Sequence, residues 1–243
     1  MESVSEPAGS RAATNALLAG LREDRFAPEA VVCFLGRAAH RSLRQAVRRP
    51  RALVELTALH CVLYALAAGR RPGRSWVVAG WGLAVSHLGL LEDRDRLAAA
   101  DLVTLLRANL PALPGGSGRG SGVLAIGLDL ADGRLARHQG TTSPFGDYAD
   151  TFADAAFWVW FTLRHEPSRT VRTAAIAAWA LPVVTVTGVA LRRGAMPERP
   201  RPVLLRPAAA LQAVVALRHL VRGRSAVRPS SRRRLRAGSR GSR

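Results

Sequence analysis

The chain has 243 residues and combines a high apolar content with a strong positive charge. Apolar residues make up 48% of the sequence, while the formal net charge at pH 7 is +19. Long apolar helices that alternate with basic loops produce this combination more readily than one soluble core does. All 36 basic residues are Arg, and the basic runs carry almost no aromatic residues that could stack on bases. The composition therefore predicts a membrane protein with no nucleic-acid partner.

The N-terminal part of the chain is basic and lacks the continuous apolar run of a secretory signal. Residues 1–27 are predicted to be disordered or loosely helical, with no cleaved leader. Pro28 suits the first position of a helix, and the sequence to Arg49 is basic and amphipathic. We expect this helix to lie on the membrane surface.

Apolar segments separated by Gly, Pro and Arg follow along the chain. Most are shorter than the roughly 20 residues that a helix perpendicular to the membrane needs. A last apolar stretch at 207–217 is about half that length and is flanked by Arg, so we place it at the interface. The six expected spans are 52–68, 76–91, 97–113, 122–135, 146–163 and 170–191.

The distribution of Arg predicts the orientation of these spans. An even number of spans puts both Arg-rich termini on one face, and the positive-inside rule makes that face cytoplasmic. Arg70, Arg71 and Arg74 would then lie outside, against the rule, although the termini together carry many more Arg residues. We expect a multi-pass protein of the cell membrane with both termini and the active site in the cytoplasm.

Carboxylates are concentrated in one otherwise apolar region. Five of the nine Asp residues fall between positions 129 and 154. Ionised carboxylates near a membrane are costly unless they are paired or bind cations. Asp129 and Asp132 are three residues apart, and Asp150 and Asp154 are four apart, so each pair projects from one face of a helix. Two such helices packed together would bring four carboxylates to a single pocket.

The chemistry of this cluster favours a hard divalent cation. Oxygen ligands without nearby Cys or His suit Mg²⁺, Mn²⁺ or Ca²⁺ better than zinc, and Mg²⁺ commonly bridges carboxylates to substrate phosphates. Gly133 lets a substrate approach the backbone, and Arg137, four residues further along the same face, can pair with phosphate. The residues predict a site for a metal-held pyrophosphate.

The region 129–154 resembles the signature of the CDP-alcohol phosphatidyltransferases, D-x2-D-G-x2-A-R-x8-G-x3-D-x3-D. The segment from Asp101 to Arg107 is also similar to the start of the family's first core helix, although Asp101 stands where many members have Asn. The resemblance covers about 97–192. Every fixed position of the signature is present: Asp129, Asp132, Gly133, Ala136, Arg137, Gly146, Asp150 and Asp154.

The resemblance implies an all-α, polytopic membrane bundle with the signature at the cytoplasmic ends of two adjacent helices. The expected architecture is about six transmembrane helices plus the N-terminal interfacial helix. The family commonly has six core helices, whereas this chain has four convincing core spans and two upstream. In one arrangement the upstream spans, 52–68 and 76–91, pack where the family's last two helices sit.

The resemblance also implies a reaction and a role for each matching residue. The family transfers a phosphatidyl group from CDP-diacylglycerol or a related CDP-alcohol to an alcohol and releases CMP, in phospholipid biosynthesis. By position, Asp129, Asp132 and Asp150 match ligands of Mg²⁺ or Mn²⁺; Gly133, Ala136 and Arg137 match the CDP-alcohol contacts; and Asp154 matches the base for the acceptor hydroxyl.

The acceptor stays open among glycerol 3-phosphate, an inositol phosphate, serine and another phospholipid. Anionic lipid headgroups and, as one option, a second copy of the chain are the other expected partners. The alternative function is a non-catalytic membrane scaffold, against which the complete signature argues. The expected organisation is a basic extension at 1–51, two additional spans at 52–96, the transferase core at 97–192, a basic loop with an interfacial helix at 193–222, and a disordered Arg-rich tail at 223–243.

Overall fold

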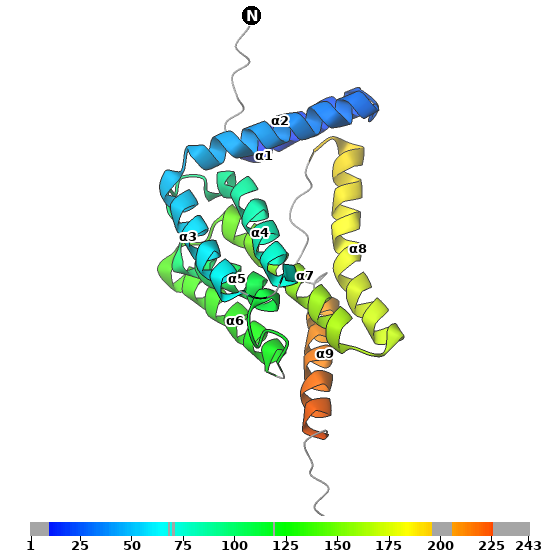
Figure 1. The fold of residues 1–243 in the computed structure, drawn as a ribbon. Coiled ribbons are helices and arrows are strands. Elements are labelled where there is room, and N and C mark those ends of the chain that lie inside the picture. Colours follow the sequence, from blue (N-terminus) through cyan, green and yellow to red (C-terminus); the bar gives the residue numbers. More distant parts are fainter. Residues whose placement is uncertain (1–9, 68, 70, 119, 196–205, 226–243) are drawn as a thin grey trace, which may run out of the picture.

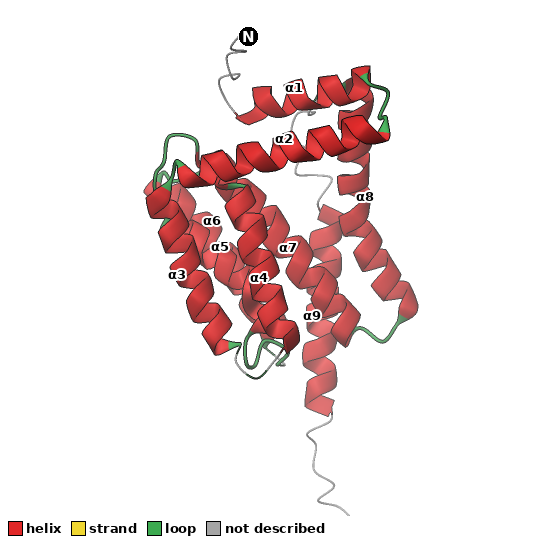
Figure 2. Ribbon diagram, turned by 45° about the horizontal axis from the view of Figure 1, so that its top comes forward, coloured by secondary structure: helices red, strands yellow, loops and turns green. Residues whose placement is uncertain are grey.

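The computed structural model describes residues 10–67, 69, 71–118, 120–195 and 206–225. Within these residues the chain is all helical and has no strand, which confirms the all-α part of the predicted fold class (Figures 1 and 2). The helices are α1 (Ser10–Glu23), α2 (Pro28–Val47), α3 (Pro50–Leu66), α4 (Arg71–Ser86), η1 (Leu88–Leu91), α5 (Ala99–Asn109), η2 (Leu110–Ala112), α6 (Ser121–Gln139), α7 (Pro144–His165), α8 (Arg169–Arg193) and α9 (Arg206–Ser225).

Local sequence signals set several helix boundaries. Ser143 caps α7 because its side chain accepts a hydrogen bond from the Gly146 backbone N–H at 3.1 Å. Ser168 caps α8 in the same way. At the other end, α6 and α8 stop at Gly140 and Gly194, whose φ angles of 62° and 66° favour glycine.

The N-terminal region is more ordered than the sequence predicted. Residues 1–27 were expected to be disordered or loosely helical, yet α1 is a regular helix from Ser10. Leu18 and Leu21 are each only 7% exposed, and α1 packs against α2 and α8. Burial of this apolar face stabilises a helix that sequence alone left undecided. Residues 1–9 lie outside the described part of the chain.

Two expected spans differ from the observed helices. The segment 69–75 was predicted as a loop, but α4 already begins at Arg71 and ends at Ser86. The expected span 97–113 is an eleven-residue helix, α5, followed by the short η2. Pro111 explains this end, because proline lacks an N–H and clashes with the preceding turn of an α-helix.

The upstream helices share a hydrophobic core with the helices that carry the signature. The hairpin of α3 and α4 packs on α5, and α2 lies across one end of the bundle (Figure 1). Helices upstream of the signature and α7 therefore bury apolar side chains in one common core. Its buried members come from α2, α3, α4, η1, α5 and α7: Ala46, Ala52, Leu56, Ala84, Leu88, Leu91, Leu105, Phe145 and Ala149.

The helix α9 is longer and better packed than the interfacial stretch predicted at 207–217. It has 20 residues, and its Val215 and Ala216 are buried in a core with Phe157 and Phe161 of α7. A Cβ at Gly122 of α6 would lie 3.1 Å from the Ala216 Cβ, so the glycine permits close contact with α9. The expected tail 223–243 begins within α9, and residues 226–243 are outside the described part.

An ion pair fastens α9 to the turn between α7 and α8. The buried carboxylate of Glu166 accepts hydrogen bonds from Arg218 Nε at 2.9 Å and Nη2 at 3.2 Å. Burial by itself would raise the pKa of Glu166. Hydrogen bonds from Arg218 and the Ser168 backbone N–H, with the charge of Arg222, instead hold this pKa below its ordinary value. The carboxylate is therefore ionised at neutral pH, as the pairing requires.

Among the described helices, α8 is the one that is long and apolar enough to cross a membrane. It covers the span expected at 170–191, and only 17% of its most apolar window is buried. The helices α3, α4 and α5 have 17, 16 and 11 residues, so they fall short of the usual spanning length. The structure does not confirm a six-span bundle.

Candidate active site

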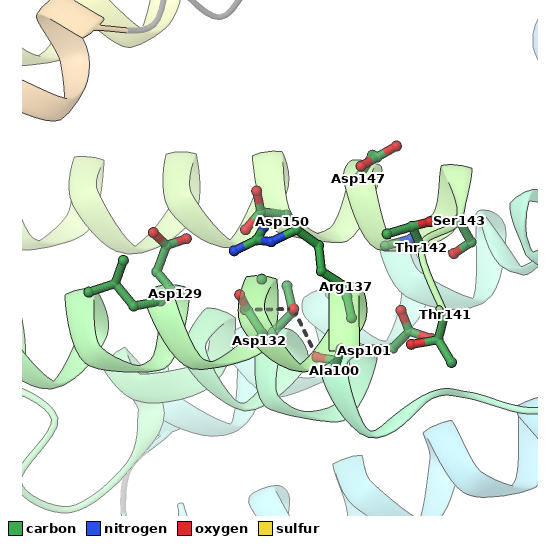
Figure 3. A pocket seen from close by; sticks show the side chains of 15 residues that line it. Ala100, Asp101, Asp129, Asp132, Arg137, Thr141, Thr142, Ser143, Asp147 and Asp150 are labelled. Atoms are coloured by element: carbon green, nitrogen blue, oxygen red, sulfur yellow. Dashed lines mark hydrogen bonds between the residues drawn. The ribbon is translucent and has the colours of Figure 1, made fainter. Parts of the chain in front are cut away.

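A pocket of about 340 Å³ opens between α5, α6 and α7 (Figure 3). It lies where the C-terminal half of α6 faces the first turns of α7, with α5 beneath both. Most of the signature residues are on its wall. The lining residues are Ala100, Asp101, Thr104, Asp129, Leu130, Asp132, Gly133, Ala136, Arg137, Thr141, Thr142, Ser143, Gly146, Asp147 and Asp150.

Three carboxylates face one another across this pocket. Asp129, Asp132 and Asp150 each offer an oxygen atom, and these atoms lie within 4.8 Å of one another (Figure 3). Ligand oxygens on opposite sides of a Mg²⁺ ion are about 4.2 Å apart, twice the usual bond length. The three side chains are thus close to the spacing that a small divalent cation requires, and the oxygen-only donor set suits such a cation.

Asp154 lies apart from this trio. It is one helical turn beyond Asp150 on α7 and does not line the pocket, so three rather than four carboxylates converge there. Its carboxylate instead reaches the cluster through Arg107, to which it is paired. The side chain of Asp154 is 20% exposed, so it is not sealed in the protein interior.

Arg107 is a residue of the candidate site to which the sequence analysis gave no role. Its side chain is 1% exposed, yet its guanidinium contacts every one of the four signature aspartates. Nη1 lies 2.8 Å from Asp129 Oδ1, and Nη2 lies 3.5 Å from Asp132 Oδ2. Further ion pairs join it to Asp150 and Asp154. The available signal was a lone Arg inside an apolar helix, because a buried charge requires partners.

The charges of this cluster do not cancel. Four carboxylates surround one guanidinium, so the acidic groups outnumber the basic group in a partly buried site. Arg107 contacts Asp129 and Asp150 through one oxygen of each carboxylate, which leaves the second oxygen of each to a cation. The site therefore has room in its charge balance for a divalent metal ion in addition to the guanidinium of Arg107.

The helix α5 is what brings the two halves of the signature together. It packs extensively against both α6 and α7, whereas α6 and α7 contact each other little. Thr104 of α5 has its Oγ1 2.8 Å from Asp132 Oδ2 and 3.0 Å from the Ala100 carbonyl oxygen (Figure 3). The two signature helices were expected to pack directly on each other. Instead, α6 and α7 both pack on α5, and Thr104 of α5 orients Asp132.

The predicted donor contacts Gly133, Ala136 and Arg137 all line the pocket. The guanidinium of Arg137 extends across it toward Asp150 (Figure 3). A Cβ at position 133 would lie 3.2 Å from Arg137 Nη1, so glycine leaves this space to the guanidinium and to a ligand. These three residues and the carboxylate trio are therefore parts of one cavity.

The end of the pocket opposite Asp129 was not predicted. Asp101 and Ser143 lie there, at the N-terminal turns of α5 and α7, together with Thr141 and Thr142 (Figure 3). The signature residue Gly146 explains how these turns come close, because a Cβ there would lie 3.2 Å from Asp101 Oδ1. These contacts join segments that are distant in the sequence, so local patterns do not reveal them.

A model of the family described as CDP-alcohol phosphatidyltransferase matches residues 121–224. Residues 121–224 contain a CDP-alcohol phosphatidyltransferase domain. Such a domain implies transfer of a phosphate-linked alcohol group from a CDP-alcohol, and this family is known to use a divalent metal. No curated protein and no solved structure matches the chain.

The matched range begins at the first residue of α6 and includes most of α9. It starts and ends later than the resemblance seen at about 97–192. Arg107 and Thr104 therefore lie before the CDP-alcohol phosphatidyltransferase domain, although both contact its aspartates.

Replacing Arg107 with Ala should destabilise the metal-free protein by about 3–5 kcal/mol, because it leaves partly buried carboxylates without their cation. Mg²⁺ should recover part of this loss. Denaturant unfolding in detergent, with chelator and then with Mg²⁺, measures both effects. Arg134→Ala is the matched control, since Arg134 is exposed on α6. Equal stability of the two variants in chelator would contradict the role given to Arg107.

Proposed function

We propose that the chain transfers the phosphatidyl group of CDP-diacylglycerol to the hydroxyl of an acceptor alcohol, in phospholipid biosynthesis. The observation that carries the proposal is the complete signature, with three of its carboxylates within 4.8 Å in one pocket of a CDP-alcohol phosphatidyltransferase domain. In this reaction a bond forms between the acceptor oxygen and the phosphorus of the phosphatidyl group. The bond to the CMP oxygen breaks, and CMP leaves.

Asp129, Asp132 and Asp150 are the proposed metal ligands. Mg²⁺ or Mn²⁺ bound there would neutralise the pyrophosphate of the donor and stabilise the departing CMP. The position of these residues on two helices, both held by α5, keeps their carboxylates oriented before a substrate arrives.

Gly133, Ala136 and Arg137 are the proposed donor contacts. Gly133 and Ala136 present little bulk on the pocket wall, so the pyrophosphate can approach the backbone of α6. The guanidinium of Arg137 reaches over the pocket and has the fork of N–H donors that binds phosphate oxygens in pairs (Figure 3). These residues hold and orient the donor.

Asp154 is the proposed general base. A carboxylate outside the ligand trio can accept the proton of the acceptor hydroxyl as that oxygen attacks phosphorus. Its ion pair with Arg107 ties it to the same guanidinium as Asp150, so its position relative to the metal ligands is fixed. These proposed roles are consistent with transfer to a hydroxyl group, and several acceptor alcohols fit them.

We also propose that the protein is a multi-pass protein of the cell membrane. The exposed, apolar α8 supports one span. The helix α2 supports an interfacial position, because a stripe of large apolar side chains is exposed along it: Val32 at 69%, Leu35 at 58%, Leu43 at 63% and Val47 at 67%. Exposed arginines follow the neighbouring stripe, where anionic headgroups would meet them: Arg37, Arg44 and Arg48.

The purified protein should release CMP from CDP-diacylglycerol in the presence of an acceptor, and chelation should abolish this release until Mg²⁺ or Mn²⁺ is restored. The product can be identified by incubating labelled donor with each candidate acceptor and measuring the mass of the lipid formed. The acceptors to be tested are glycerol 3-phosphate, inositol phosphate, serine and phospholipid. Full turnover in metal-free buffer would contradict the assignment of the three aspartates as metal ligands. Absence of CMP release with every CDP-alcohol would favour the scaffold alternative.

Asp154→Asn should lose turnover by about 10²- to 10⁴-fold while largely keeping donor binding, because Asn preserves shape but cannot accept a proton. Asp129→Asn should lose both turnover and donor binding, since the metal ligands also hold the pyrophosphate. Turnover assays and binding of CDP-diacylglycerol to each variant make the comparison. Equally weak donor binding by the two variants would show that the division into ligands and base is wrong.

The two native cysteines provide a test of orientation. Both are exposed, with Cys33 on α2 and Cys61 on α3. If α2 lies on the cytoplasmic face, a membrane-impermeant thiol reagent should leave Cys33 unmodified in intact cells and modify it after the cells are opened. Cys61→Ala isolates this signal, and Cys33→Ala is the matched control. Modification of Cys33 in intact cells would place α2 on the outer face.

A further inference from the structure

The segment between η1 and α5, residues 92–98, is fixed by the upstream helix α3. The Ala52 backbone N–H donates to the Asp95 carbonyl oxygen at 3.0 Å. The Leu97 backbone N–H donates to Glu55 Oε2 at 2.9 Å. These bonds come from the first turns of α3, which precedes the CDP-alcohol phosphatidyltransferase domain. The upstream region therefore sets the path of this segment.

One side chain of the segment, Arg94, contacts two residues that line the signature pocket. Arg94 Nη2 lies 3.0 Å from Asp101 Oδ2 and 2.6 Å from Ser143 Oγ, so a single nitrogen bonds to both. The Arg94 side chain is 25% exposed and that of Asp101 is 3% exposed. Pairing with a cation offsets part of the cost of burying the Asp101 carboxylate, and hydrogen bonds of this kind are among the stronger ones in proteins.

Both partners of Arg94 line the pocket and begin a helix that builds it. Asp101 Oδ2 accepts a hydrogen bond from the Ala98 backbone N–H at 2.8 Å, at the start of α5. Ser143 Oγ accepts from the Gly146 backbone N–H at 3.1 Å, at the start of α7. Arg94 thus connects the caps of the two helices that carry Arg107 and Asp150.

We propose that Arg94 is a positioning residue for the end of the pocket opposite Asp129, and that through it the upstream helix α3 contributes to the substrate site. The inference rests on the proposed function of the pocket. Asp101 and Ser143 lie at the end opposite Asp129 (Figure 3). Arg94 contacts Asp101 and Ser143 but none of the three proposed metal ligands. Loss of Arg94 should therefore loosen this end of the pocket first, so we expect donor binding to weaken more than turnover.

Arg94→Gln should raise the KM for the CDP-alcohol about tenfold and change kcat by less than about threefold, the pattern expected when a contact serves binding rather than chemistry. Arg51→Gln is the matched control, because Arg51 of α3 contacts the same segment through Asp95. Arg51 pairs with Asp95 at 2.7 Å, but the two side chains are 70% and 60% exposed, so this pair contributes little. The control should keep the wild-type KM. An unchanged donor KM in Arg94→Gln overturns the inference.

Arg94→Lys keeps the test decisive if Arg94→Gln does not fold. Lysine retains the charge but lacks the rigid fork of arginine, so it should restore the donor KM in part. A wild-type KM in Arg94→Lys, in the absence of a folded Gln variant, overturns the inference. Failure of the proposed function is distinguishable, because the wild-type protein would then release no CMP from any CDP-alcohol.

Discussion

A charge removed from water must be neutralised inside the protein, and Arg107 is where this constraint acts most strongly. Its buried guanidinium is surrounded by four carboxylates that belong to two other helices. Neither α6 nor α7 could bring these carboxylates together without α5 between them, because the two helices contact each other little. The position of the pocket, and the net negative charge that suits a divalent cation, both follow from this arrangement.

The pocket that results has two ends with different chemistry. Asp129, Asp132 and Asp150 form one end, where charge is concentrated. Asp101 and Ser143 form the other, where helix caps and Arg94 fix the wall.

Residues outside the CDP-alcohol phosphatidyltransferase domain at 121–224 contact the candidate site. Helices α2 to α5 share a core with α7, and α5 contributes Thr104 and Arg107 to the aspartate cluster. The segment from 92 to 98 places Arg94 against Asp101 and Ser143, which line the pocket. The upstream helices therefore shape the site in addition to extending the bundle.

The sequence by itself determined the elements whose causes are local. The three- and four-residue spacing of Asp129, Asp132, Asp150 and Asp154 placed each pair on one helix face, and helix ends followed proline, serine and glycine. Only the tertiary structure decided that α5 joins these faces, that Arg107 is their common partner, and that α1 is a regular helix. Arg107 is 47 residues from Asp154, and Arg94 is 49 residues from Ser143. Contacts at such separations depend on how apolar helix faces pack, and helical periodicity does not specify which faces meet.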